Sequence, residues 1–441
     1  MHIVSSSDVA VVILAAGQGV RMRSTLPKVM HCVGLRPMFE HALETAESLA
    51  GGGAGKITAV FRPGMEPTAT VYASRVRAVY QEKQRGTGHA LKTAVDAGLP
   101  TSRIVLVLYG DTPLVKADTL RAMTQVIENG ASVCVAGFRT SCPGAYGRLM
   151  AGEGNALERI VEFKDANAEQ RAVTLCNSGV MALRSEGLEE RLTALTPNNA
   201  GGEYYLTDLV ALARARGERC AYVEAEAEEF VGVNDRVELA KVEAIFQQSM
   251  RERAMRGGAT LIAPDTVFFA ADTEIGQDVV VEPHVFFGLG VRLGDGVRIK
   301  AFSTLEGCAV SSGAVVGPYA RLRPGAKIGE GARIGNFVEV KNASVGTGAK
   351  INHLSYVGDA TVGTGANIGA GAVTCNYDGT KKSRTDIGRE AFIGSNAALV
   401  APVRIGARAR VAAGSVITDD VSDDSLAIAR SRQIEKKDYY G

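Results

Sequence analysis

The chain has 441 residues, of which 46% are hydrophobic and 22% are charged. This length favours two or three domains, and the formal net charge of +1 excludes the global positive field typical of nucleic-acid-binding proteins. The seven cysteines contain no CxxC pair, which argues against a zinc knuckle or a disulfide framework and favours free thiols in a reducing compartment.

The first residues, MHIVSSSDVAVVILAAG, contain no basic region, and their apolar run is too short to span a bilayer. We therefore expect a cytoplasmic protein without a membrane span, in which residues 9–17 form a buried strand. Further strand-like runs lie at 57–61, 103–110, 131–138, 175–183 and 220–225, with helical segments such as 37–50 and 88–99 between them. This alternation predicts an α/β domain with a largely parallel sheet, whose ligands gather beyond the carboxyl ends of its strands.

The loop after the first strand is rich in small residues. Gly17 and Gly19 lie in this loop, and Arg21 and Lys28 follow them. The Rossmann fingerprint would require a third glycine where Met22 stands, and the Walker A pattern also fails. What remains is a turn of backbone N–H donors beside two cations, which suits a triphosphate.

Two later segments are consistent with a nucleotide site. Asp111 directly follows the strand-like run LVLYG, where its carboxylate either holds Mg²⁺ against phosphate oxygens or caps the following turn. The segment QEKQRGTGHAL at 81–91 contains glutamines, Gly86 and Thr87, which suit hydrogen bonding to the edge of a base. We expect His89 to pack within the helix that begins there.

From Val237 to about Gly257 the sequence contains neither proline nor an internal glycine and has apolar residues at near-helical spacing. One connecting helix is therefore predicted, ended by Gly257 and Gly258. The implied domains are residues 1–236, a linker helix at 237–257 and a second domain at 258–441.

Beyond the linker an aliphatic residue returns every sixth position, usually followed by a small residue. The series includes Ile275, Val281, Phe287, Leu293, Ile299 and Leu305, and, after short slips, Leu322, Ile328, Ile334, Val340, Ile351, Val357, Ile368, Ile393, Leu399, Ile405 and Val411. This period is typical of the hexapeptide repeats of a parallel β-helix. Three hexads make one coil, so the repeats from 275 to 422 predict about eight coils.

Some residues depart from the repeat. His353 is the third residue of the hexad begun by Ile351, which predicts a corner position facing solvent or another chain. There it is either a proton carrier or, less in keeping with this phase, a hydrogen-bonded core histidine. Arg323 and Lys341 replace small residues three hexads apart, so we expect a stacked pair that is either solvated or binds a phosphate. Residues 374–386 interrupt the repeat and are expected to project as a loop beside a site.

The motifs of both halves together suggest a family. They are LAAGQGVRM, LPK, QRGTGHA, LYGDTPL, YGRL, IVEFKDA, NSGV, GEYYLTD and GVNDR, then PYARLRPGA, GNFVEVKN, NHLSYVGDA, NIGAGAVTCNYDG, FIGSN, LVAPV and LAIAR. With them the chain resembles, over nearly its whole length, the bacterial bifunctional N-acetylglucosamine-1-phosphate uridylyltransferase and glucosamine-1-phosphate N-acetyltransferase (GlmU) family. The fold implied is an α/β nucleotidyltransferase (Rossmann-like) domain, a connecting helix and a left-handed parallel β-helix of hexapeptide repeats.

By this resemblance the first domain joins UTP to N-acetylglucosamine-1-phosphate and releases pyrophosphate. Arg21 and Lys28 would stabilise developing charge together with Mg²⁺ held by Asp111 and Asn234. The nucleotide contacts implied are Leu14, Ala15, Ala16, Gly17 and Lys28, with Gln81, Gly86 and Thr87 near uracil, and the sugar pocket comprises Tyr109, Gly110, Gly147, Glu162 and Asn177.

The second domain would carry out the preceding step, acetyl transfer from acetyl-CoA to the amine of glucosamine-1-phosphate. An amine with a pKa of about 8 is mostly protonated near neutral pH, so it must lose a proton before it attacks, and His353 would be the general base. The resemblance implies sugar phosphate contacts from Arg323, Lys341, Tyr356 and Asn367, and acetyl-CoA contacts from Ala370, Asn376, Tyr377, Ser395, Ala413 and Arg430. Sites of this type form between prisms, so a homotrimer is expected.

The chain departs from the family pattern where Val20 replaces threonine and Gly201 replaces glutamine, and it ends soon after Arg430. Three alternatives remain: a nucleotidyltransferase with a purely structural β-helix, a non-catalytic subunit of the translation-initiation exchange factor type, and a zinc hydratase. The first gives no role to Arg323, Lys341 and His353 together. The second does not require the metal-binding residues of the first half, and the third lacks a three-histidine set.

Overall fold

The structure is a computed structural model that describes residues 8–53 and 55–440. The chain is organised as two compact units, Met1–Phe246 and Gln247–Gly441. The first expected strand is present as β1 (Val9–Leu14), whereas residues 1–7 of the same apolar start lie outside the described residues. Within the described ranges, no helix has the length and apolar character needed to cross a membrane.

The first unit is built on one mixed sheet with the strand order β11-β7-β10-β6-β1-β4-β5, to which β8 and β9 are added beside β10. Besides β1, its strands are β4 (Ile57–Phe61), β5 (Arg77–Tyr80), β6 (Ile104–Tyr109), β7 (Val133–Arg139), β8 (Arg148–Ala151), β9 (Leu157–Val161), β10 (Leu175–Arg184) and β11 (Cys220–Glu224). β1 runs parallel to β4 and β6, while β10 runs antiparallel to β6 and β7. The predicted parallel core is confirmed, with β10 as an antiparallel insertion.

Both faces of this sheet are buried, which explains why β1 reads as a continuous apolar run. Val11 and Ile13 belong to one hydrophobic core, whereas Val12 and Leu14 belong to the core on the opposite face. The helices of the unit are α1 (Met38–Ala50), α2 (Glu66–Val71), α3 (Thr87–Asp96), α4 (Ala117–Glu128), α5 (Ala168–Ala172), α6 (Leu188–Thr193) and α7 (Asp208–Ala215). The loops after β1 and β6 leave the same sheet edge, because these neighbouring strands are parallel.

The predicted linker helix is α8 (Arg236–Arg256). After this helix comes the β-helix, which has three faces. Its first face consists of β12 (Thr260–Leu261), β15 (Val280–Val281), β18 (Arg298–Ile299), β21 (Val315–Val316), β24 (Arg333–Asn336), β27 (Lys350–His353), β30 (Asn367–Ile368), β33 (Phe392–Ile393), β36 (Arg410–Val411) and β38 (Leu426–Ala427). The second face consists of β13 (Phe268–Phe269), β16 (Phe286–Phe287), β19 (Thr304–Leu305), β22 (Arg321–Leu322), β25 (Glu339–Lys341), β28 (Tyr356–Gly358), β31 (Val373–Cys375), β34 (Ala398–Val400) and β37 (Val416–Ile417). The third face consists of β14 (Glu274–Ile275), β17 (Arg292–Leu293), β20 (Ala309–Val310), β23 (Lys327–Ile328), β26 (Ser344–Val345), β29 (Ala360–Val362), β32 (Thr385–Ile387) and β35 (Val403–Ile405).

The aliphatic residues of the hexads stack inside this prism, as predicted. Ile334, Ile351 and Ile368 pair in register in successive coils, and Ile334 and Ile351 are fully buried. The small residue that follows allows the coils to approach, because a Cβ on Gly335 would lie only 1.8 Å from the carbonyl oxygen of Asn352. The predicted fold class is confirmed.

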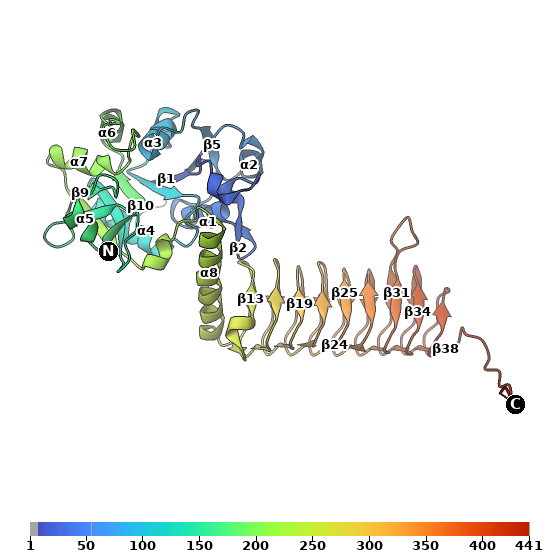
Figure 1. Ribbon diagram of the computed structural model, residues 1–441. Coiled ribbons are helices and arrows are strands. Elements are labelled where there is room, and N and C mark those ends of the chain that lie inside the picture. Colours follow the sequence, from blue (N-terminus) through green and yellow to red (C-terminus); the bar gives the residue numbers. More distant parts are fainter. Residues whose placement is uncertain (1–7, 54, 441) are drawn as a thin grey trace. The chain divides into compact units, whose positions relative to one another are not determined.

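The stack begins two strands before the predicted start at 275, which is the third side of the first coil. Leu261 and Phe269 already point into it, and their strands pair with the next coil in register. A 3-10 turn at Pro264–Thr266 lengthens the first side of the prism, so the hexad period is hidden there. The predicted interruption is also present: residues 376–384 project as a loop between β31 and β32 (Figure 1).

Replacing Ile351 by alanine should destabilise the second unit by about 2–5 kcal/mol, because the rigid stack cannot collapse around the cavity. Ser344→Ala, an outward-facing change on the third face, should alter the free energy of unfolding by less than about 0.5 kcal/mol. Urea unfolding followed by circular dichroism measures both. Equal effects of the two changes would contradict the inward stacking of Ile351.

Candidate functional site

The carboxyl edge of the first unit's sheet brings together three polar residues. Lys28 begins a 3-10 turn (Lys28–Met30), Asp111 follows β6, and Asn234 lies just before α8. The ammonium group of Lys28 forms an ion pair with Asp111 and lies 3.3 Å from Oδ1 of Asn234. Two side-chain oxygens from residues distant in sequence therefore lie beside one positive charge.

This donor set fits Mg²⁺, which prefers carboxylate and carbonyl oxygens and keeps several water or phosphate ligands. The ammonium group of Lys28 shows that the oxygens of Asp111 and Asn234 can share one cation. No group of three His, Cys, Asp or Glu able to hold a metal occurs among the described residues. Most of the remaining coordination would therefore come from a nucleotide and from water.

A hollow of about 290 Å³ opens beside these groups. It is lined by Leu14, Ala16, Gly17, Gln81, Gln84, Gly86, Thr87, Ala90, Tyr109, Asp111 and Glu203. Most of the residues expected to bind nucleotide thus share one cavity between β1, β6 and the start of α3. Ala15 and Gly110 are buried, Arg21 is exposed on the turn Val20–Met22, and these three residues are not part of the lining.

The residues expected around the sugar also meet. Gly147 precedes β8, Glu162 follows β9, and Asn177 lies in β10. The backbone N–H of Asn177 donates to the carbonyl of Gly147 at 2.8 Å. A Cβ on Gly147 would lie 3.2 Å from the carboxylate of Glu162, so a larger residue there would push against this carboxylate. Burial raises the pKa of Glu162, although a hydrogen bond from Thr207 at 3.1 Å opposes this.

Tyr109 forms the wall between the two regions. Burial, with the nearby Asp111 and Glu162, raises the pKa of its phenol, which therefore stays protonated at neutral pH. A Cβ on Gly179 would lie 2.9 Å from the Tyr109 ring, so the ring packs on bare backbone. Val20 is 76% exposed and Gly201 lies against Tyr205, and nothing in the structure assigns either departure a substrate contact.

In the β-helix, His353 ends β27 at the corner between the first and second faces, as its phase predicts, and is exposed. Its Nδ1 lies 2.7 Å from Oδ1 of Asn336, the residue beside it in the preceding coil. An amide oxygen can only accept, so Nδ1 carries the proton and Nε2 keeps a free lone pair. The arrangement suits a general base.

The predicted stacked cations lie on the second face. Arg323 and Lys341 occupy equivalent positions in successive coils, and Arg323 donates to Glu339 at 2.8 Å. The pKa of Lys341 is lowered, chiefly by Lys382 from the projecting loop and by Arg323. Arg323, Lys341 and Lys382 therefore gather in one region, and a phosphate is a ligand that such a cluster of cations suits.

A buried carboxylate organises the residues beside these cations. Burial alone would raise the pKa of Asp359, but hydrogen bonds from Asn342 and Asn376 and the nearby cations hold it below the usual range. Asn376 also lies 3.5 Å from the hydroxyl of Tyr356, so both side chains are held in place. Tyr377 is exposed in the projecting loop.

The residues expected to bind acetyl-CoA form a column above His353. The register aligns Ile351, Ile368, Ile393 and Val411, so the residues two positions later are His353, Ala370, Ser395 and Ala413. Arg430 donates to the carbonyl of Ala413 at 2.9 Å. With coils spaced about 4.8 Å apart, these small residues provide roughly 14 Å of narrow corner, suited to a long, thin ligand.

The predicted sugar-phosphate residues are not all brought together within one chain. Arg323, Lys341 and Tyr356 lie on the second face, whereas Asn367 begins β30 on the first face. Outward-facing side chains on two faces of a triangular prism point away from each other. One chain therefore presents two partial sites on either side of the corner.

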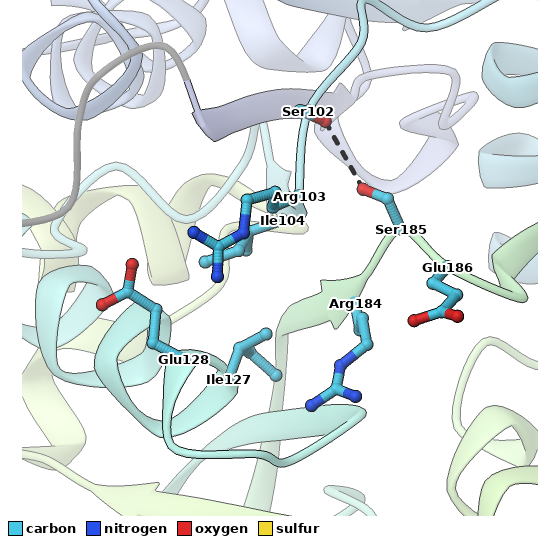
Figure 2. Close-up of a pocket in the computed structure, with 8 residues that line it drawn as sticks. All are labelled: Ser102, Arg103, Ile104, Ile127, Glu128, Arg184, Ser185 and Glu186. Carbon is cyan, nitrogen blue, oxygen red and sulfur yellow. Dashed lines mark hydrogen bonds between the residues drawn. The ribbon is translucent and has the colours of Figure 1, made fainter.

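Further hollows on the described surface include two larger ones. One, of about 490 Å³, borders His353 on the first face and includes Arg298, Lys300, Arg333 and Asn336. The other, of about 400 Å³, lies at the opposite sheet edge from Asp111, at the start of β6 and the end of β10 (Figure 2). It contains none of the expected site residues; its lining is Ser102, Arg103, Ile104, Ile127, Glu128, Arg184, Ser185 and Glu186.

The residues of the β-helix site that sequence reasoning did not single out include Asp359 and Lys382. Lys382 belongs to a basic run in the predicted loop, which was the available signal. Asp359 follows a hexad glycine and resembles an ordinary corner aspartate, so only its buried contacts with Asn342 and Asn376 distinguish it.

Comparisons with known proteins agree with this architecture. A MobA-like NTP transferase domain matches residues 11–196, and bacterial transferase hexapeptide repeats match residues 307–342 and 384–419. The curated relatives include the bifunctional protein GlmU of Paramagnetospirillum magneticum, 52% identical over 98% of this chain and 96% of that protein. GlmU of Zymomonas mobilis is 49% identical over 96% of this chain and 95% of that protein.

Among solved structures, a CMP:2-keto-3-deoxy-manno-octonic acid synthetase complexed with CTP aligns with 55% of this chain and 99% of its own. Its TM-score of 0.43 and identity of 18% are too low to support an inference. The relatives, by contrast, match both units in one continuous order. The chain therefore belongs to the family of bifunctional GlmU proteins, and it is an enzyme with uridylyltransferase and glucosamine-1-phosphate N-acetyltransferase activities.

Proposed function

We propose that the hollow beside Asp111 carries out uridylyl transfer and that the corner at His353 carries out acetyl transfer. The observation that supports this division most strongly is that each half gathers the groups for one reaction. Lys28, Asp111 and Asn234 converge at the sheet edge, and His353 presents a free Nε2 beside a column of small residues. The functional domains then correspond to residues 1–236 and 258–441, joined by the helix at 237–257.

In uridylyl transfer, a phosphate oxygen of N-acetylglucosamine-1-phosphate attacks the α-phosphorus of UTP, and pyrophosphate leaves. No covalent enzyme intermediate is required, so the protein contributes position and charge. Lys28 and Arg21 stabilise the triphosphate, and Asp111 with Asn234 would hold Mg²⁺, which neutralises charge on the phosphates when bound. Gly147 and Asn177 orient the sugar.

In acetyl transfer, the amine nitrogen of glucosamine-1-phosphate attacks the thioester carbon and CoA leaves as its thiol. Nε2 of His353 takes a proton from the amine, while Asn336 holds the ring through Nδ1. The phosphate of the sugar is bound by Arg323 and Lys341, and the pantetheine arm follows the corner column Ala370, Ser395 and Ala413 towards Arg430. Asn376 and Tyr377 lie beside the reacting groups.

The two partial acetyl sites support a homotrimer. If the first face of one chain packs against the second face of another, His353 and Asn367 meet Arg323, Lys341 and Tyr356 across the interface. Three such heterologous contacts close a ring. The shared corner also carries an exposed column of stacked rings, His284, Phe302, Tyr319 and Phe337, with centroids 4.9–5.1 Å apart, which a trimer axis would cover.

The remaining expectations are consistent with this function. UTP and acetyl-CoA are small, soluble co-substrates of a reducing compartment, which accords with a cytoplasmic enzyme and with the free state of all seven cysteines. Neither reaction requires nucleic acid or a membrane surface.

Asp111→Ala should lower uridylyl transfer by at least about 100-fold, because both a metal ligand and the partner of Lys28 are lost. Acetyl transfer by the same protein should be unchanged. Separate assays of pyrophosphate release and of CoA release measure the two reactions. Asp118→Ala, at a 93% exposed aspartate of the same unit, is the matched control. Unchanged pyrophosphate release in the Asp111 variant would exclude its proposed role.

His353→Ala should reduce acetyl transfer by about 10²- to 10⁴-fold, since no other group removes the proton from the amine. Uridylyl transfer from UTP to added N-acetylglucosamine-1-phosphate should persist at the wild-type rate. If both activities fell together, the assignment of one reaction to each half would be wrong.

Co-expression tests whether the acetyl site is shared between chains. His353→Ala and Lys341→Ala chains should each be inactive alone, yet mixed oligomers should regain part of the acetyl transfer, because some interfaces combine two intact halves. The matched control pairs Arg323→Ala with Lys341→Ala, which damage the same face and should not complement. Failure of the first pair, with mixed oligomers verified by differential tags, would place the whole site within one chain.

A further inference from the structure

The side chain of Gln81 is buried at the end of the nucleotide hollow, where it is 3% exposed. Its Nε2 lies 3.2 Å from the carbonyl oxygen of Gly86 and 2.9 Å from Nδ1 of His89. His89 lies in the first turn of α3 and is half-buried, with the Tyr204 ring 6.2 Å away. Neither reaction described above uses His89.

These contacts define the orientation of the amide. The carbonyl of Gly86 can only accept, so the end of the Gln81 amide that faces it is the NH₂ group. The same nitrogen faces Nδ1 of His89, which must therefore accept a hydrogen bond and carry no proton. Oε1 of Gln81 makes no hydrogen bond within the described part of the chain, so it remains an acceptor for a ligand.

Other residues of the pocket wall offer hydrogen-bond donors rather than acceptors. The backbone N–H groups of Gly86 and Thr87 precede the first intrahelical bonds of α3 and donate to no described residue. Gly86 has φ of 107°, and a Cβ there would lie 2.6 Å from the carbonyl of Tyr204, so this turn requires glycine. The residues that line this hollow therefore include one acceptor and two donors without a partner among the described residues.

We propose that His89 is a positioning residue that determines base specificity, because it holds Gln81 with its oxygen towards the base. This inference rests on the proposed placement of the base beside Gln81 and Gly86. Uracil presents a donor, N3–H, flanked by two carbonyl acceptors, which complements Oε1 of Gln81 and the N–H groups of Gly86 and Thr87. Cytosine presents an acceptor at N3, which would face Oε1 without a proton between them.

The charges around His89 keep its ring neutral. Burial lowers its pKa first, and Arg85 and Lys92 lower it further, while Asp96 opposes them. Because the pKa lies below the ordinary value of about 6.5, Nδ1 remains an acceptor at neutral pH. Protonation in more acid solution would make Nδ1 a donor, which cannot face the amide NH₂, and Gln81 would lose its fixed orientation.

The test compares kcat/KM for UTP, CTP and N3-methyl-UTP in the wild-type protein, His89→Leu and His89→Asn. His89→Leu removes the acceptor and should lower the UTP-to-CTP ratio about tenfold. His89→Asn places Oδ1 near the former Nδ1 and should retain the ratio. Acetyl transfer by each full-length variant controls for intact protein. The wild-type ratio should be constant near neutral pH and fall in acid, whereas that of His89→Asn should stay flat.

The outcomes separate the inference from the proposal beneath it. Wild-type protein that uses N3-methyl-UTP as well as UTP would show that the base does not lie against Gln81. A strong preference for UTP over N3-methyl-UTP, together with an unchanged UTP-to-CTP ratio in His89→Leu, would overturn the role of His89 alone. If His89→Leu does not fold, a wild-type ratio that stays constant through acid pH would overturn it equally.

Discussion

The inward stacking of one aliphatic side chain per hexad is the constraint on which the second unit depends. Because Ile334, Ile351 and Ile368 lie directly above one another, the remaining positions of the hexad also repeat once per coil. A residue's phase then decides whether it lies inside, on a face or at a corner. The charged and ionisable groups of the proposed acetyl site, such as Lys341 and His353, lie where outward positions depart from small residues.

The first unit depends on a different constraint, the burial of both faces of its sheet. Helices cover both faces, so polar groups are left to the strand ends, and β1 and β6 deliver their loops to the same edge. Lys28, Asp111 and Gln81 meet there although they are distant in sequence. His89 lies behind Gln81 and contacts its amide nitrogen at 2.9 Å.

Periodicity explains how much of this could be predicted from sequence. The continuous apolar runs of β1, β4 and β6 and the hexads were recognisable because each is buried in a regular phase. β5, β8 and β9 were not predicted, since they are only partly buried and contain no long apolar run. Asn367 and Lys341 lie on different faces, which agrees with their spacing of five hexads, because only residues separated by a multiple of three hexads share a face.

The residues of the corner column above His353 are spaced by whole coils, about 4.8 Å each. An insertion such as the loop at 376–384 does not change this spacing, because the chain leaves the prism after one strand and returns to it at the next. Removing one complete coil between Ala370 and Ala413 would instead bring the carbonyl of Ala413, which accepts from Arg430, about 4.8 Å closer to His353. If acetyl-CoA lies along this column as proposed, an acyl carrier with a shorter arm would then reach the imidazole, and the number of coils would set the length of the donor.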